Sequence, residues 1–180
     1  MAIIHQASIT PTKGELLDGL FGEPTVTLGA YRFDDPAGEV GIEGFVVAVG
    51  AATRHVVLSY RAAPLEDAAA SLVSTMEHSV LGRRWIYDAS ADPVAMACFA
   101  RALRGEQQQA SEEIWDGTER VAIREPSARV ELVSGAGPLD AETAGAAAPV
   151  IVTDLDAALG DRSGARLVAR WDGGSATVAY

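Results

Sequence analysis

An acidic segment, residues 31–43, holds side chains whose types fit cation binding or acid–base chemistry. Its carboxylates are Asp34, Asp35, Glu39 and Glu43. Converging carboxylates ligate divalent cations or act as proton donor and acceptor pairs. The spacing is not that of a calcium-binding loop, and Asp is also favoured at turns because it hydrogen-bonds nearby backbone groups. We therefore predict no metal site in this segment.

The same carboxylates also fit a solvated face of a β-sheet. In a strand, alternate residues share a face, so Glu39 and Glu43 would point to the same side. Charged residues lie mostly at protein surfaces, and Arg32 and Arg61 are the cations expected to pair with them. Asp35, Glu39 and Glu43 are thus candidates for a surface that binds a ligand or a partner.

A second polar segment, residues 75–88, combines an imidazole, guanidinium groups and aromatic rings. Its candidate site residues are His78, Arg84 and Trp85. Histidine can act as a base, arginine can bind an anion or a sugar hydroxyl, and tryptophan can stack on a sugar. The histidines at positions 5, 55 and 78 fall in separate predicted strands without metal-ligand spacing. Since no catalytic triad can be assigned, we favour a binding or structural role and name no catalytic residue.

The lysine and asparagine content argues against phosphoryl transfer by the chain itself. A Walker loop needs a Gly-Lys-Ser/Thr sequence, and kinase-like catalysis needs a lysine, a base Asp and a metal-holding Asn. Lys13 is the only lysine, and the chain contains no asparagine. Residues 134–138 are glycine-rich but lack a lysine. We therefore predict neither an enzyme nor a bound cofactor.

The charge balance and the cysteine content limit the partners and the compartment. With 25 acidic and 14 basic residues, the net charge is −11, which disfavours nucleic acid because phosphate binding needs clustered Lys and Arg. Cys98 is the only cysteine, so we predict a buried residue in a cytoplasmic protein without an intrachain disulfide. No apolar run approaches the roughly 18–20 residues of a membrane span, and residues 1–9 lack the basic start of a signal peptide. We expect a soluble protein with no membrane partner.

Two predicted helices accompany the strands that must carry these groups. The first begins after Thr12, where Glu15 completes a capping box, and ends at Gly22. The second begins after Asp92, has proline at its first position and ends before Gly105. Its predicted buried stripe, at i, i+3, i+4 and i+7, consists of Met96, Phe99, Ala100 and Leu103.

Alternating and β-branched runs predict strands in the rest of the chain. The predicted ranges are 2–9, 25–33, 40–49, 55–61, 72–80 and 84–87, with a turn at 35–38. A short turn of helix is predicted within residues 64–70. Residues 106–180 are β-rich, with hairpin turns at Asp116-Gly117 and at Asp172-Gly173. Between these turns, the Gly/Ala-rich residues 134–148 predict a loop.

Several short stretches recur in an order that is typical of one bacterial family. They are IIHQA at 3–7, DPAGEVGIE at 35–43, LSYRAAPL at 58–65 and EHSVLG to WIYD at 77–88, followed by Asp92-Pro93. Over residues 1–105 the chain resembles the N-terminal cap domain of maltokinases, and residues 106–180 resemble the tail of stand-alone members in general character. The resemblance implies an α+β fold of antiparallel β-sheets with two helices, in which a cystatin-like cap domain at 1–105 precedes a β-rich extension at 106–180.

The resemblance also carries a functional expectation. In the full enzymes the cap packs on a two-lobed kinase that makes maltose 1-phosphate from maltose and ATP, and the cap holds none of the catalytic residues. The expected function is therefore a non-catalytic accessory or regulatory module of α-glucan or sugar-kinase metabolism, which docks on a sugar kinase or glucan enzyme in trans. Two alternatives stay open. One is a binder of a sugar or sugar phosphate near His78, Arg84 and Trp85; the other is a self-associating homo-oligomer paired through an edge strand.

Overall fold

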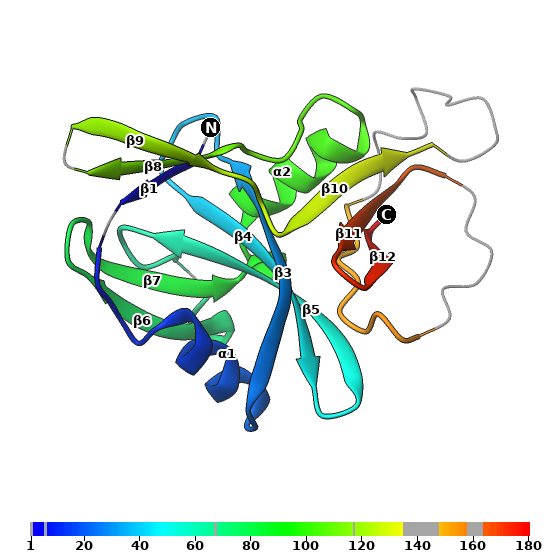
Figure 1. Cartoon of the computed structure of the whole chain (residues 1–180), viewed down its shortest axis with the longest axis horizontal. Helices are drawn as coiled ribbons and strands as arrows, with labels where there is room; N and C mark the ends of the chain where they lie inside the picture. Colours follow the sequence, from blue (N-terminus) through cyan, green and yellow to red (C-terminus); the bar gives the residue numbers. More distant parts are fainter. Residues whose placement is uncertain (1, 6, 67, 117, 135–147, 158–163) are drawn as a thin grey trace.

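The chain builds three β-sheets and two α-helices in a computed structural model, which describes residues 2–5, 7–66, 68–116, 118–134, 148–157 and 164–180 (Figure 1). The largest sheet has six antiparallel strands in the order β2-β6-β7-β5-β4-β3. Their bounds are Ile9–Thr10 (β2), Thr25–Asp34 (β3), Gly41–Val49 (β4), Ala52–Arg61 (β5), Leu72–His78 (β6) and Gly82–Asp88 (β7). The strands predicted between residues 25 and 88 are confirmed, and so is the α+β class.

Two three-stranded sheets flank the six-stranded sheet. One consists of Ala2–His5 (β1), Glu112–Asp116 (β8) and Glu119–Arg124 (β9), in the order β1-β8-β9. The other consists of Ala128–Val133 (β10), Arg166–Trp171 (β11) and Gly174–Ala179 (β12), all antiparallel. In Figure 1 the β1-β8-β9 sheet lies at the upper left and the β10–β12 sheet at the right.

The single N-terminal strand predicted over residues 2–9 is wrong in its extent. The structure divides it into β1, which pairs with β8 in parallel, and β2, which pairs with β6 at the edge of the six-stranded sheet. The apolar run could not show this division because the two halves find partners more than sixty residues away along the chain.

Both helices begin where the sequence predicts. Helix α1 covers Lys13–Phe21; Thr12 and Glu15 form the capping box, and Gly22 ends the helix with a φ of 72°. Helix α2 covers Pro93–Leu103, and the Asp92 carboxylate caps it by accepting hydrogen bonds from the amides of residues 94 and 95. A short 3-10 helix, Ala69–Ser71, stands near the helical turn predicted within residues 64–70.

The stripe that α2 buries is displaced from the prediction. Phe99 is fully buried as expected, but its buried neighbours are Ala95, Cys98 and Ala102. Met96 and Ala100 are only half-buried. The spacing identified the helix correctly, yet small residues occupy the centre of its contact because they allow the helix backbone to approach the sheet closely. The buried position predicted for Cys98 is confirmed.

The six-stranded sheet packs on both faces. Its α2 face, which carries Tyr31, Phe33, Ile42 and Val57, packs against α2 and against residues of the β10–β12 sheet. Its α1 face, which carries Phe45, Val47, Leu58, Met76 and Ile86, packs against Leu16 and Leu17 of α1. Successive side chains of a strand point to opposite faces, so each strand supplies both clusters.

Residues on both sides of position 105 share one apolar cluster. Ala128, Leu167 and Val178 belong to the same buried cluster as Phe33 and Phe99. A boundary between two domains at residues 105 and 106 stays a prediction.

The turn predicted at Asp172-Gly173 joins β11 to β12, and Gly173 has a φ of 89°. Gly117 of the other predicted turn, and residues 135–147 of the predicted loop, lie outside the described residues. Neither described helix has the length and hydropathy that a bilayer crossing requires.

Candidate functional site

A cleft of about 750 Å³ opens on the α1 face of the six-stranded sheet, beside the first residue of α1. Its lining includes Lys13 from the helix and residues from the segment that joins β3 to β4. The hairpin formed by β6 and β7 contributes Met76, His78, Leu81 and Arg84. The cleft therefore lies where helix α1 stops covering the sheet.

Four of the six predicted site residues line this cleft: Asp35, Glu39, His78 and Arg84. Glu43 reaches it indirectly, through ion pairs with two lining residues. Trp85 does not belong to the cleft, because it follows Arg84 in β7 and therefore points to the α2 face. There it stands opposite Arg61 of β5. The two polar segments are thus brought together, apart from the tryptophan.

Glu43 is the buried charge of the site, only 2% exposed. Its two oxygens accept hydrogen bonds from Lys13 Nζ at 2.7 Å and from Arg32 Nη2 at 3.2 Å. Burial opposes ionisation of Glu43, but the two cations outweigh burial and lower the pKa of this carboxyl. The predicted pairing with Arg32 is confirmed, and it makes Glu43 a buried link between α1 and the sheet rather than a solvated side chain.

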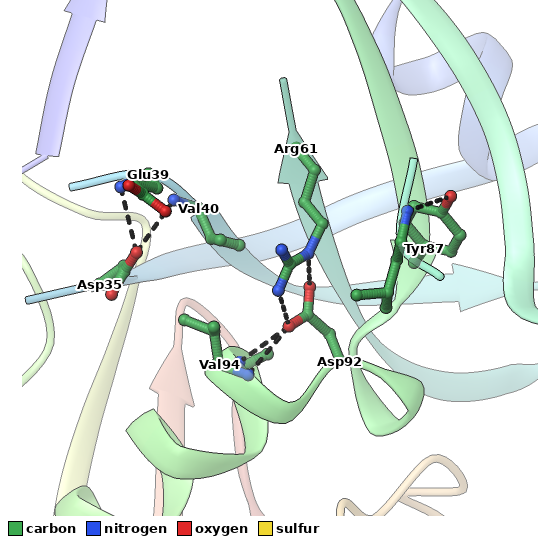
Figure 2. A network of polar contacts seen from close by, with 9 residues as sticks. Asp35, Glu39, Val40, Arg61, Tyr87, Asp92 and Val94 are labelled. Carbon is green, nitrogen blue, oxygen red and sulfur yellow. Dashed lines mark hydrogen bonds and ion pairs between the residues drawn. The ribbon is translucent and has the colours of Figure 1, made fainter. Parts of the chain in front are cut away.

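The expectation that Glu39 and Glu43 share a face of one strand is wrong. Strand β4 begins at Gly41, so Glu39 lies in the turn before it, where its side chain is exposed. Asp35 organises this turn: its carboxylate accepts hydrogen bonds from the amides of Glu39 and Val40 at 3.0 and 3.1 Å (Figure 2). It also accepts one from the amide of Ala37 at 3.0 Å. The Asp35 carboxylate is thus occupied by backbone groups.

Arg61 pairs with Asp92 and not with the acidic segment, which corrects the sequence-based expectation. Its Nε and Nη2 donate to the two carboxylate oxygens of Asp92 at 2.7 and 2.6 Å (Figure 2). Asp92 is fully buried. Burial raises the pKa of Asp92, but the hydrogen bonds and the charge of Arg61, together with the other hydrogen bonds to this carboxylate, outweigh burial and lower the pKa. This pair lies on the α2 face and fixes the start of α2, so it belongs to the framework.

His78 and Arg84 hold the backbone of the turn between β6 and β7. His78 Nδ1 accepts hydrogen bonds from the amides of Val80 and Leu81 at 3.2 and 3.1 Å. Arg84 Nη2 donates to the carbonyl oxygen of Leu81 at 2.8 Å. These contacts give both side chains a structural role in shaping the tip of the hairpin.

Two floor residues of the cleft were not among the predicted site residues: Arg32, which was expected only as an ion-pair partner, and Tyr60. They come from β3 and β5, and their side chains reach the α1 face because Arg32 stands opposite Glu43 and Tyr60 stands opposite Ile86. Period-two alternation assigns each residue to a face of its own strand, but only the strand register shows that the faces coincide.

Another missed contact is buried under the α2 face. His55 is fully buried, and its Nε2 lies 2.9 Å from Tyr31 Oη while its Nδ1 lies 2.7 Å from the carbonyl oxygen of Val152. Because a carbonyl only accepts, Nδ1 carries the proton and Nε2 accepts from the tyrosine. Burial lowers the pKa of His55 to about 4. Among the described residues, no group of three or more His, Cys, Asp or Glu side chains is placed to hold a metal ion.

Comparison with protein families gives one match. Residues 21–92 match the model of the maltokinase N-terminal cap domain. No curated protein and no solved structure matches the chain. The matched segment runs from the last residue of α1 to the N-cap of α2, and it holds the strands β3 to β7 that carry most of the cleft. This confirms the resemblance seen in the sequence, over a shorter range than 1–105: residues 21–92 are similar to the maltokinase N-terminal cap domain.

Proposed function

We propose that this protein is a non-catalytic accessory module of sugar-kinase metabolism, which docks through the tip of the β6–β7 hairpin onto a sugar kinase in trans. The family match gives the link to maltokinases. The observation that carries the docking role is the tip itself, where two polar side chains hold the backbone and two apolar side chains face outward.

The tip has the features of a small preorganised anchor. Val80 and Leu81 are 56% and 45% exposed, and the bonds from His78 and Arg84 fix the backbone beneath them. Gly82, with a φ of 72°, lets the chain turn back into β7. A fixed turn loses little conformational entropy on binding, and apolar anchors that enter a pocket supply most of the affinity of an interface.

The charge of the protein favours one kind of partner surface. With a net charge of −11, the chain associates faster with a basic surface than with an acidic one, because long-range attraction guides the encounter. The proposed partner therefore presents an apolar pocket for Val80 and Leu81 within a basic surround.

The test is a pull-down from native lysate with tagged protein, followed by mass spectrometry and by affinity measurement with the purified kinase that is recovered. Val80→Glu should weaken kinase binding about tenfold or more, because it places a charge in an apolar pocket. Val26→Glu is the matched control: Val26 is 63% exposed on β3, outside the tip, and its replacement should leave binding unchanged.

Two results would contradict this proposal. One is the absence of any sugar kinase among the retained proteins. The other is equal kinase binding by Val80→Glu and the wild type. Recovery of the protein alone, with a mass that rises with concentration, would favour the self-associating alternative.

A further inference from the structure

Three buried polar atoms in the cleft have no partner at hydrogen-bond geometry among the residues that the structure describes. They are Arg32 Nε, Tyr60 Oη and Arg84 Nε. Each belongs to a different strand, and all three residues line the same 750 Å³ cleft. Buried polar atoms without a partner are rare in folded proteins, and each one calls for a physical explanation.

The strand register explains why these atoms belong to one site. Arg84 stands opposite Met76, Tyr60 opposite Ile86, and Arg32 opposite Glu43. Met76 and Ile86 belong to the cluster that packs under α1, so all three polar side chains point to the α1 face. Strands β7, β5, β4 and β3 are consecutive neighbours in the sheet, which places the three residues across one floor.

These groups select an acceptor. A guanidinium N–H only donates hydrogen bonds. Burial, with a further contribution from the Glu43 charge, raises the pKa of the Tyr60 phenol well above its usual value, so the phenol keeps its proton and can donate as well. The floor thus offers three donors, which match the oxygens of a carboxylate or phosphate group better than they match another donor.

The charges on the floor also favour an anion. Lys13 and Arg32 share one carboxylate, that of Glu43. Within the described parts of the chain, no carboxylate lies within ion-pair distance of Arg84, whose Nη2 binds only the carbonyl oxygen of Leu81. Asp34, which lies on the same face of β3 as Arg32, also lines the cleft. The floor thus has three cations, Lys13, Arg32 and Arg84, against two carboxylates, Asp34 and Glu43, in a protein whose net charge is −11.

The rim limits how much negative charge the ligand can carry. The Asp35 carboxylate is occupied by backbone amides, but Glu39 is exposed at the mouth and would repel a polyanion. Ile9, Val40 and Met76 give the walls apolar area. A volume of this size is typical of sites for small organic molecules.

We propose that this cleft binds a small organic oxyanion, a phosphate monoester or a carboxylate, whose oxygens accept hydrogen bonds from Arg32, Tyr60 and Arg84. The rest of the ligand lies against the apolar walls below the hairpin tip. This site needs no kinase partner, so it stands independently of the docking function proposed above.

Isothermal titration calorimetry at low salt tests the site with four probes: inorganic phosphate, glucose 1-phosphate, gluconate and glucose. Glucose 1-phosphate and gluconate show whether the cleft prefers a phosphate monoester or a carboxylate. We expect saturable binding of at least one of the two organic anions and no binding of neutral glucose. Inorganic phosphate should bind more weakly, because it has no organic part to contact the apolar walls. Binding of glucose as tight as that of the anions, or no binding of any anion at millimolar concentration, would overturn the proposal.

Three variants locate the binding. Arg84→Met should weaken the binding of the organic anion about tenfold or more. Tyr60→Phe, which removes a single oxygen, should weaken this binding about three- to tenfold. The matched control is Arg83→Met: Arg83 is 60% exposed and pairs with Glu77, on the opposite face of β7. Equal affinity in wild type, Arg84→Met and Tyr60→Phe would place the ligand elsewhere and reject the site. If Arg84→Met fails to fold, the affinity of Tyr60→Phe for the organic anion still tests whether the ligand binds in the cleft.

Discussion

The two faces of the six-stranded sheet differ in how many of their buried polar atoms find partners within the protein. On the α2 face, two pairs of polar side chains bond inside the protein, Tyr31 with His55 and Arg61 with Asp92, and Ser59 Oγ is the one buried side-chain atom of that face without a partner among the described residues. On the α1 face, Arg32, Tyr60 and Arg84 each keep a buried polar atom that finds no partner within the described ranges. The same strands supply both sets, since neighbouring residues in a strand face opposite ways.

The difference follows from what covers each face. The α2 face meets both α2 and the β10–β12 sheet, so its polar groups are enclosed and a missing partner would be costly. The α1 face is covered by a helix of nine residues, which leaves part of the floor open to a cleft. One face of the sheet serves stability, and the other has room for recognition.

The largest effect should come from Asp92 on the α2 face. Asp92→Ala removes the cap of α2 and leaves the Arg61 guanidinium without its partner, so we expect a loss of about 4 kcal/mol in the free energy of unfolding. Urea denaturation measures it. The exposed pair Arg83–Glu77 gives the control, because Glu77→Ala should change stability by less than about 0.5 kcal/mol. A small effect at Asp92 would mean that the α2 face tolerates unpaired charge.

Two glycines of β4 show how much space each face of the sheet leaves for an added Cβ. A Cβ at Gly44 would lie 2.3 Å from the Tyr31 ring, whereas a Cβ at Gly41 would lie 3.5 Å from Tyr60, an ordinary contact. Gly44→Ala must displace Tyr31 from His55, so we expect a loss of about 3 kcal/mol. Gly41→Ala should cost less than about 1 kcal/mol. Equal costs in urea denaturation would show that the two faces are equally packed.

Acid should expose the role of the buried His55. Its pKa is about 4 in the folded protein, against an ordinary 6.5. Between pH 6.5 and pH 4, therefore, His55 binds a proton in the unfolded chain but stays neutral in the folded protein. The stability that His55 contributes is therefore complete above pH 6.5 and falls as the pH drops toward 4, by about 3 kcal/mol in all. Denaturation between pH 6.5 and 5 measures the slope before the carboxylates titrate, and His55→Gln should flatten it. An unchanged slope would contradict a neutral, buried His55.

The smallest effects on stability are expected from removing two tyrosine hydroxyls, one on each face of the sheet. Tyr31→Phe leaves His55 Nε2 without a donor, so it should cost about 1–2 kcal/mol. Tyr60→Phe removes a hydroxyl that has no partner at hydrogen-bond geometry in the described parts of the chain, so it should be neutral or slightly stabilising. Thermal denaturation of the two variants measures the difference in stability. A loss of stability in Tyr60→Phe as large as that in Tyr31→Phe would show that the Tyr60 hydroxyl has a hydrogen-bond partner within the fold.

Local signals in the sequence were sufficient for the elements. Thr12 and Glu15 predicted the start of α1, Asp92 predicted the start of α2, and β-branched runs predicted the strands from residue 25 to 88; the structure confirms each. These features succeed because capping and alternation depend on residues only a few positions apart.

Contacts between distant residues could not be predicted in this way. Arg61 was expected near the acidic turn, but its partner is Asp92, thirty-one positions away. The cleft depends on the registers of β3, β5 and β7, and a shift by one residue would move Arg32 and Tyr60 to the other face. The candidate site could thus be recognised as two polar segments, while its floor required the structure.

The parallel pairing of β1 with β8 has a consequence for synthesis on the ribosome. Residues 2–5 pair with residues that are made about 110 positions later, which at ~5–20 residues per second is a delay on the order of ten seconds. The six-stranded sheet, whose strands end at Asp88, can form during that interval. Strand β1 leaves the ribosome before the strands of the six-stranded sheet but finds its partner after they have been made, so a chaperone that binds nascent apolar segments has time to bind it.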